Sequence, residues 1–462
     1  MKQTIILLLG MLPLLGYAQP DPTLWKGTLR AQGMNIDILF QLTEGPDGWS
    51  CTMDVPLQGL DDFPASSVEA AGDSLRVEFS MIPAHYRGVF SRDGQAITGN
   101  WYQGGQAFPL NMQRTEQPIT SSRPQEPRPP FPYESIEVTF PSHTDSTVVL
   151  AGTFTYPKQA TAGYGVVLVS GSGPQDRNEE LMGHKPFLVL SDYLTRHGIA
   201  VLRYDDRSVG ASTGSRRTAT VEDFAEDALG GLRYLARQEF ITCEKIGVIG
   251  HSEGGMVAAI LGARDATDFI VMMAGPGTEL DELLIDQVLF MDQQAGFGKK
   301  AIEQDTAYAW ALYRLVRESA GGDLDTNAMR ALVEDYYRSS SNIRQQFPSL
   351  EAFMASQVGQ VSSPWFRHFI NFVPQDHLSK IKCPVLALNG GKDFQVPAEK
   401  NLRAIETALI QGPCVDFEIR QFPGLNHLFQ PAETGHMDEY ARIPVTIDQR
   451  VLETITIWIL GR

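Results

Sequence analysis

Ser252 is the first residue of this sequence whose surroundings could support chemistry. It lies in the stretch GHSEGG, residues 250–255, which fits the pattern Gly-x-Ser-x-Gly. That spacing is typical of a serine nucleophile on a sharp turn, because small residues on both sides prevent backbone clashes. Ser212 lies in a second match, GASTG at 210–214. The pattern alone therefore leaves two serines to compare.

The chain on either side distinguishes the two serines. Ser252 follows the apolar run KIGVIG (245–250) and precedes GMVAAILGA (255–263), which has the composition of a buried helix. A strand, a turn and a helix in this order aim the positive end of the helix at a developing negative charge. Ser212 stands between polar stretches. Ser252 is therefore the predicted nucleophile, against the alternative of a tight packing turn, and Ser212 is a predicted loop residue.

A serine nucleophile needs a general base, usually histidine, and a carboxylate that orients this base. In α/β-hydrolases the acid and then the histidine follow the serine along the chain. Asp393 comes just after the strand pattern CPVLALNG, where ligands bind in open α/β sheets. His427 follows the last clear strand pattern on a Gly-Asn loop. We therefore predict Asp393 as the acid and His427 as the base.

Other acids and histidines compete for these two roles. Asp416 falls inside a strand pattern and Glu399 lies near a predicted helix start, so both are less well placed. His436 lies in a polar segment with no strand leading into it. His368 and His377 fall within, or at the end of, a long helical region. The usual alternative for any single histidine is a hydrogen-bonded packing role.

Two backbone N–H groups are expected to bind the oxyanion that forms during acyl transfer. One belongs to Glu253, the residue after the predicted nucleophile. The other belongs to the loop GSGPQDRN (171–178), where Ser172 is the preferred donor and Gly173 the alternative. A flexible turn would also explain these glycines, whereas the phosphate-loop and dinucleotide-binding patterns are absent. No cofactor is therefore predicted.

The elements that would position these residues extend from about residue 133 to the end of the chain. Strand patterns such as GYGVVLVSG and IAVLRYD alternate there with helical patterns, which predicts a mainly parallel sheet with helices on both faces. Residues 278–380 interrupt this alternation with helical patterns and are too long for a simple loop. We interpret them as a helical cap over the carboxyl edge of the sheet. Its aromatic residues could line a pocket or form the core of the cap, and they are Tyr308, Trp310, Tyr313, Trp365, Phe366 and Phe369.

The chain before residue 133 has a different sequence pattern. Residues 19–116 show short period-two runs between turn residues, which predicts a small all-β, barrel-like domain. Residues 117–132 are rich in proline and are predicted to be a semi-rigid linker. Residues 1–18 have a basic start, an apolar core too short to span a bilayer and a Gly-Tyr-Ala end, as in a signal peptide. We therefore expect an exported protein, periplasmic or secreted.

Charge and cysteine content exclude several classes of partner. The net charge of −17 argues against nucleic acid and anionic membranes as partners. No later apolar run is long enough for membrane insertion. The cysteines have no metal-like spacing, so no metal is predicted. All four are interpreted as packed thiols, with a Cys383–Cys414 bridge as the alternative, and they are Cys51, Cys243, Cys383 and Cys414.

Five blocks of the sequence, in order, resemble the bacterial α/β-hydrolases of the EstD-type esterase group. They are GSGPQDRNE, HKPFLVLSDYLTRHGIAVLRYDDRSVGASTG, GHSEGG, NGGKDFQVP and GLNHLFQ. The resemblance covers about 133–462 and implies a serine carboxylesterase that uses Ser252, Asp393 and His427 on short-chain acyl esters. Two positions depart from the pattern, since Ser170 stands where histidine is common and Ser208 where glycine is expected. The N-terminal domain looks like small calycin-like barrels attached to secreted hydrolases.

Three alternatives to an esterase stay open at the level of the sequence. A serine peptidase of the prolyl-oligopeptidase kind shares the order of catalytic residues, but its β domain is typically a propeller, for which 19–116 is too short. A thioesterase or acyltransferase is disfavoured by export, because coenzyme A substrates are intracellular. A non-catalytic binding protein is disfavoured by the complete set of Ser252, Asp393 and His427. We therefore expect a small-molecule ester as the binding partner.

Overall fold

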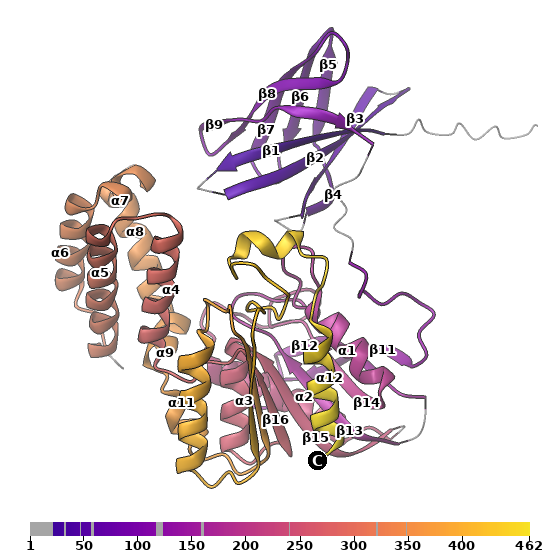
Figure 1. Cartoon of the computed structure of the whole chain (residues 1–462), viewed down its shortest axis with the longest axis vertical. Helices are drawn as coiled ribbons and strands as arrows, with labels where there is room; N and C mark the ends of the chain where they lie inside the picture. Colours follow the sequence, from indigo (N-terminus) through magenta and orange to yellow (C-terminus); the bar gives the residue numbers. More distant parts are fainter. Residues whose placement is uncertain are drawn as a thin grey trace, which may run out of the picture. The chain divides into compact units, whose positions relative to one another are not determined.

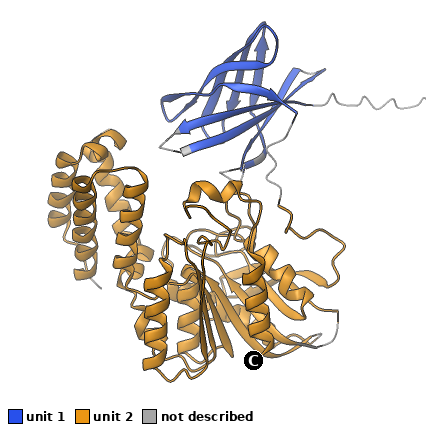
Figure 2. Ribbon diagram, in the orientation of Figure 1, with its two compact units in different colours: residues 1–120 blue, residues 121–462 orange. Residues whose placement is uncertain are grey.

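The computed structural model describes residues 22–31, 34–46, 48–56, 60–116, 123–158, 161–239, 241–319, 322–347 and 349–462. The predicted signal peptide, 1–18, lies outside these residues. The chain divides into two compact units, Met1–Thr120 and Ser121–Arg462, as Figure 2 shows. Each unit has its own apolar core and is described by itself.

The first unit is an antiparallel sheet of ten strands that surrounds one apolar core, with the order β4-β3-β2-β1-β10-β8-β7-β6-β5 and β9 beside β8 (Figure 1). Apolar and polar residues alternate along these strands, so that one face packs into the core. In β6, Leu75, Val77 and Phe79 are buried while the residues between them face outward. The predicted all-β domain is thus confirmed as an antiparallel sheet domain. Its strands are β1 (Thr23–Ala31), β2 (Met34–Gly45), β3 (Gly48–Val55), β4 (Leu60–Pro64), β5 (Ser67–Ala71), β6 (Ser74–Phe79), β7 (Ala84–Phe90), β8 (Ala96–Gln103), β9 (Gln106–Pro109) and β10 (Met112–Thr115).

The second half of the predicted linker differs from a simple spacer. Residues 123–132 belong to the second unit, where Arg123 donates hydrogen bonds to the carbonyl oxygens of Met182, Gly183, Ala441 and Ile443. Proline-rich composition predicts an extended backbone, but it carries no signal for what that backbone contacts. A guanidinium with several donors in a fixed geometry is able to dock such a segment.

The second unit contains an eight-stranded sheet with the order β11-β12-β14-β13-β15-β16-β17-β18. The first two pairings, β11 with β12 and β12 with β14, are antiparallel, and the others are parallel. Central strands are buried on both faces, which explains their continuous apolar runs. The strands are β11 (Glu134–Pro141), β12 (Val149–Tyr156), β13 (Thr161–Val169), β14 (Ile199–Tyr204), β15 (Thr242–His251), β16 (Phe269–Met273), β17 (Val385–Gly390) and β18 (Phe417–Phe422).

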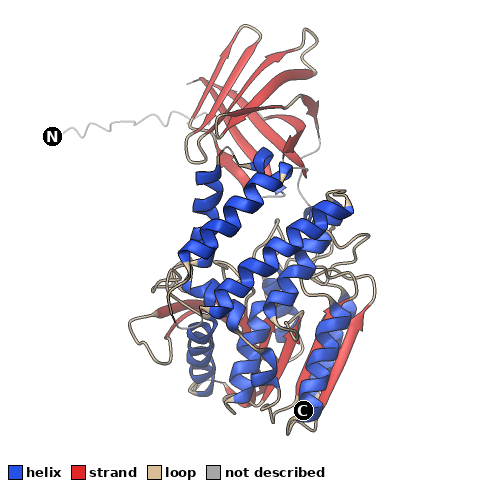
Figure 3. Ribbon diagram, turned by 90° about the vertical axis from the view of Figure 1, so that its left-hand side faces the viewer, coloured by secondary structure: helices blue, strands red, loops and turns tan. Residues whose placement is uncertain are grey.

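Helices cover both faces of this sheet (Figure 3). One face packs against α1 (Pro186–Arg196) and α12 (Gln449–Leu460). The opposite face packs against α2 (Val221–Ala236), α3 (Glu253–Ala263) and α11 (Ala398–Gln411). This layered arrangement confirms the predicted α/β-hydrolase fold. None of the described helices is long and apolar enough to cross a membrane.

The long insertion after β16 is helical, as its sequence predicts. Its helices share an apolar cluster of their own, which includes Leu312, Val316, Val333 and Phe353. A 3₁₀ helix, η2 (Met437–Arg442), lies later in the chain. The helices of the insertion are α4 (Leu280–Gln294), α5 (Lys299–Glu318), α6 (Thr326–Ser339), α7 (Ser341–Gln346), α8 (Leu350–Val361), α9 (Pro364–Asn371) and α10 (Pro374–Leu378).

Candidate active site

Ser252 occupies the turn between β15 and α3. Its backbone has φ 53° and ψ −117°, a left-handed conformation that is rare for residues other than glycine. Its N–H donates to the carbonyl oxygen of Met273 at 2.8 Å, which holds the turn against the end of β16. A strained residue in such a position is typical of functional sites. The side chain of Ser252 is half-buried and lines a pocket.

The glycines on either side of Ser252 are required by close backbone approach. A Cβ atom on Gly250 would lie 1.9 Å from the carbonyl oxygen of Gly254, and one on Gly254 would lie 2.1 Å from that of Val169. Neither position therefore accepts a larger residue without a shift of the backbone. The Gly-x-Ser-x-Gly pattern of the sequence thus has a steric cause at this turn.

His427 and Asp393 lie together, although they come from different loops. His427 Nδ1 and Asp393 Oδ2 are 2.7 Å apart, and both residues are buried. The other carboxylate oxygen of Asp393 accepts the backbone N–H groups of Gln395 and Val396 at 2.8 and 2.9 Å. These bonds orient the carboxylate toward the imidazole. The structure therefore joins the predicted acid to the predicted base.

The loop that carries His427 is held by the amide of its neighbour. Asn426 is completely buried, and its Oδ1 accepts the N–H groups of Leu428 and Gln430 at 3.1 and 2.9 Å. A side chain that satisfies local backbone donors in this way stabilises a tight loop. His427 is thereby positioned just after β18, beside the loop that follows β17.

Three carboxylates hold the loop that contains the predicted oxyanion donors. Asp206 accepts the Ser170 hydroxyl and the Gln175 N–H, each at 3.0 Å, and pairs with Arg216 at 2.7 Å. Asp205 accepts the N–H and the guanidinium of Arg177. Glu179, the third, accepts the Gly171 N–H at 2.7 Å. Burial raises the pKa of Asp206 to about 6. Ser170, a departure from the family pattern, is thus part of the loop's anchoring.

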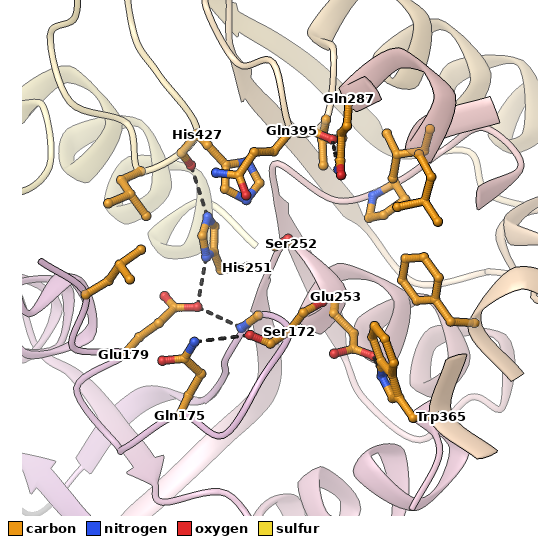
Figure 4. Close-up of a pocket in the computed structure, with 18 of the residues that line it drawn as sticks. Ser172, Gln175, Glu179, His251, Ser252, Glu253, Gln287, Trp365, Gln395 and His427 are labelled. Carbon is orange, nitrogen blue, oxygen red and sulfur yellow. Dashed lines mark hydrogen bonds and ion pairs between the residues drawn. The ribbon is translucent and has the colours of Figure 1, made fainter. Parts of the chain in front are cut away.

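His251 and Glu179 contribute to the site, although sequence reasoning did not select them. His251 Nδ1 lies 2.8 Å from Glu179 Oε1, and His251 Nε2 lies 3.0 Å from the backbone oxygen of His427 (Figure 4). Both residues fall inside the quoted blocks GHSEGG and GSGPQDRNE, so their types were visible. The pairing was not visible, because the two blocks lie far apart along the chain.

A cavity of about 270 Å³ brings these groups together at the carboxyl edge of the sheet (Figure 4). The sheet and its loops contribute polar groups, whereas α4 and α9 of the insertion contribute a mainly apolar wall. Ser172 and Glu253, the residues of the predicted oxyanion donors, both line it, with Gly171 beside them. The cavity thus holds a serine, a histidine paired with a carboxylate, and a cover of apolar side chains. This arrangement is suited to nucleophilic attack on an acyl group.

Comparisons with known proteins identify the family of this chain. A model of the alpha/beta hydrolase family matches residues 166–443. The chain belongs to the α/β hydrolase family. It is also 25% identical over 311 residues to esterase EstD of Thermotoga maritima, a match that covers 67% of this chain and 65% of that protein. The resemblance to the EstD-type group is therefore confirmed, while the match spans less than two thirds of the relative's length.

Solved structures of other hydrolases align with the chain at low identity. The esterase Pf2001 of Pyrococcus furiosus is 17% identical, with 71% of this chain and 90% of that chain covered and a TM-score of 0.41. Proline iminopeptidase of Mycobacterium smegmatis is also 17% identical, with 71% and 98% covered and the same TM-score of 0.41.

In this α/β hydrolase the side chain of Glu253 points into the cavity wall. Trp365 of α9 donates its indole N–H to Glu253 Oε1 at 2.5 Å, and Ser172 also favours the charged form of this carboxylate. Burial raises the pKa of Glu253 to about 7.

The rival residues of the sequence do not line this cavity. Ser212 donates its hydroxyl to the Asp205 carbonyl oxygen and accepts the Ala151 N–H. Asp416 is exposed immediately before β18, and Glu399 is exposed in the first turn of α11. His436 begins η2. The remaining two lie on helices of the insertion, His368 on α9 and His377 on α10.

The aromatic residues of the insertion divide between the wall of the cavity and the core of the insertion. Trp365, Phe366 and Phe369 line the cavity. Tyr308 and Tyr313 pack in the insertion's core, and Trp310 is 39% exposed.

All four cysteines are free thiols, and Cys414 Sγ donates to the Cys383 carbonyl oxygen instead of forming a bridge. Within the described ranges no group of three or more His, Cys, Asp or Glu side chains is placed to hold a metal ion.

Proposed function

We propose that this protein is a carboxylic ester hydrolase that cleaves short-chain acyl esters through an acyl-enzyme intermediate. The observation that carries the proposal is the bond between His427 and Asp393 beside Ser252 in one cavity. The EstD relative is named an esterase, which supports the same reaction class. A cavity of about 270 Å³ under an apolar wall suits short acyl chains.

The proposed reaction has two acyl-transfer steps. His427 takes the hydroxyl proton of Ser252, and the serine oxygen attacks the ester carbonyl carbon. The N–H groups of Glu253 and Ser172, with Gly173 as the alternative to Ser172, stabilise the oxyanion. His427 then protonates the leaving alcohol, which departs as the acyl-serine ester forms. Water activated by His427 cleaves this ester and regenerates Ser252.

Asp393 has a supporting electrostatic role in this proposal. Its carboxylate accepts the Nδ1 proton of His427, which leaves Nε2 free to act as the base. The same carboxylate stabilises the imidazolium that forms during attack. Export by the predicted signal peptide, 1–18, is proposed as well, and it would place the enzyme where extracellular or periplasmic esters are its substrates.

The decisive experiment is turnover of p-nitrophenyl esters, from acetate to decanoate, by purified protein and by Ser252→Ala. We expect hydrolysis with a short-chain optimum, loss of turnover in the variant, and labelling of Ser252 by a fluorophosphonate. An amino-acyl p-nitroanilide tests for a peptidase. Preferred cleavage of the anilide, or no turnover and no label, would refute the esterase proposal.

A further inference from the structure

Of the described ionisable side chains that line the cavity, one carboxylate has no partner of opposite charge. Among the described residues that line it, the ionisable side chains are Glu179, His251, Glu253 and His427, and none is lysine or arginine. Glu179 pairs with His251, and His427 pairs with Asp393. The ion pairs found in the described part of the chain do not include Glu253. Glu253 is therefore the carboxylate of this wall that lacks a cationic partner.

The contacts of Glu253 stabilise its carboxylate without neutralising it. Trp365 donates a hydrogen bond from an uncharged group, and the uncharged Ser172 also favours the charged form of Glu253. Arg216 is close enough to favour the charge of Glu253, but its guanidinium is bonded to Asp206 at 2.7 Å. Since burial raises the pKa of Glu253 to about 7, its charged form is populated at neutral pH but disfavoured by its surroundings. A cation in the cavity would relieve this cost.

Aromatic rings lie next to this carboxylate. Trp365 and Phe369 have ring centroids 5.0 Å apart, and both line the cavity with Phe366. Aromatic faces attract alkylammonium groups, and they do so most strongly where water is excluded. A carboxylate bonded directly to the edge of an indole thus combines two features that favour a cation over an anion.

Resting on the proposed esterase function, we propose that Glu253 makes this cavity selective for esters that carry an alkylammonium group, with neutral esters second and anionic esters excluded. An ammonium placed near Glu253 gains Coulomb attraction in a partly dehydrated site. A carboxylate placed there meets a like charge, which costs binding free energy. Glu253 is thus a specificity-determining residue in addition to the source of one oxyanion donor.

Two sets of matched esters test the proposal, because the charge could lie on either side of the ester bond. Ethyl β-alaninate, ethyl butyrate and monoethyl succinate differ in charge at the end of a similar acyl chain. Acetylcholine and 3,3-dimethylbutyl acetate differ in charge on the alcohol. In at least one set we expect kcat/KM to be about tenfold higher for the cationic than for the neutral ester, and in the acyl set we expect monoethyl succinate to have the lowest value.

Glu253→Gln tests the assignment to this residue, since it keeps the shape and the backbone N–H but removes the charge. We expect the ratio of cationic to neutral kcat/KM to fall to about one within this variant. Glu282→Gln is the matched control, because Glu282 is an exposed carboxylate on α4 beside the lining residue Leu283. Its ratio should equal that of the wild type.

A measurement on the wild type alone guards against a variant that does not fold. Choline and its neutral analogue 3,3-dimethylbutanol are compared as inhibitors at pH 8, and we expect choline to bind about tenfold more tightly. The inference is overturned if neutral esters are hydrolysed but the ratio of cationic to neutral kcat/KM is below about twofold in both sets. It is also overturned if Glu253→Gln leaves this ratio unchanged. If no ester is turned over at all, the proposed function itself fails.

Discussion

His251 and Glu179 form a buried pair that connects the loop after β13 to the loop that carries His427. The ring of His251 faces an acceptor at each nitrogen, the Glu179 carboxylate at 2.8 Å and the backbone oxygen of His427 at 3.0 Å. Burial lowers the pKa of His251, but Glu179 and the backbone oxygen of His427 raise it by more, which favours the protonated imidazole that donates at both nitrogens. Glu179 also binds the Gly171 N–H. The pair therefore ties the oxyanion loop to the loop of the predicted base.

Glu179→Gln is expected to impair positioning more than substrate binding. The amide cannot balance the charge of His251, so the imidazole loses a proton and one of its two hydrogen bonds. We expect kcat to fall about tenfold or more with little change in KM, and the free energy of unfolding to fall by about 3 kcal/mol. Steady-state kinetics and urea unfolding measure both. The adjacent exposed Glu180, changed to Gln, should leave kcat unaltered; an equal loss there would contradict this role.

The stability supplied by His251 should depend on pH with a defined sign. Burial alone lowers the pKa of His251, but the charge and hydrogen bond of Glu179 outweigh it, and the pKa is raised above its usual 6.5. The contribution is therefore complete below about pH 6.5 and is lost as the pH rises through the folded-state pKa. We expect the difference in unfolding free energy between wild type and His251→Asn to shrink between about pH 6 and pH 9. A constant difference across this range would contradict a charged His251.

Asp393→Asn should abolish most of the activity while leaving the fold intact. Asparagine cannot hold the Nδ1 proton of His427 in the same way, so the base adopts an unsuitable tautomer. The expected loss of kcat is about 10³- to 10⁴-fold for ester hydrolysis. Asp416→Asn is the matched control, because Asp416 is the exposed rival acid before β18. Comparable losses in the two variants would refute the assignment of the acid.

Gly254→Ala should disrupt the turn that carries Ser252. The added methyl group would lie 2.1 Å from the Val169 carbonyl oxygen, a backbone atom that cannot move away alone. We expect a loss of about 3 kcal/mol in unfolding free energy and of fluorophosphonate labelling. Gly298→Ala, which has no atom within 4 Å of the new methyl group, is the control and should keep both. Wild-type labelling in the Gly254 variant would show that the turn tolerates the side chain.

Charge selection by Glu253 should strengthen as the pH rises. With a pKa raised to about 7 by burial, the carboxylate is mostly neutral near pH 6 and mostly charged near pH 8. The ratio of cationic to neutral kcat/KM should therefore increase across this range. Trp365 and Arg216 lower this pKa and Asp206 raises it, so Trp365→Phe should move the transition to higher pH. A pH-independent ratio in the wild type would argue against titration of Glu253.

Arg123→Ala should release the segment that precedes β11. Four carbonyl oxygens lose their donor, and each hydrogen bond to a charged group is worth more than a neutral one. We expect the second unit to lose about 3 kcal/mol of unfolding free energy and residues 123–132 to become sensitive to protease. Arg128→Ala, at an exposed position of the same segment, should match the wild type. Equal protease sensitivity of the two variants would show that Arg123 does not hold the segment.

The sequence by itself determined the features that depend on local chemistry. Small residues around Ser252, strand patterns before Asp393 and His427, and period-two alternation in strands such as β6 are visible along the chain, because local sterics and burial impose them. Their order also indicated which fold would bring the serine, acid and histidine to one edge of a sheet. The helical insertion followed from its length and periodicity.

Only the tertiary structure decided how distant polar groups pair. Glu179 lies on the loop after β13 and His251 is the last residue of β15, and they meet because those two strands are neighbours in the sheet. The docking of Arg123 and the contact of Glu253 with Trp365 likewise join segments far apart in sequence. A buried polar contact leaves no periodic pattern, because its partner is chosen by strand order and loop position in space. The charge of the cavity wall is therefore a property of the fold.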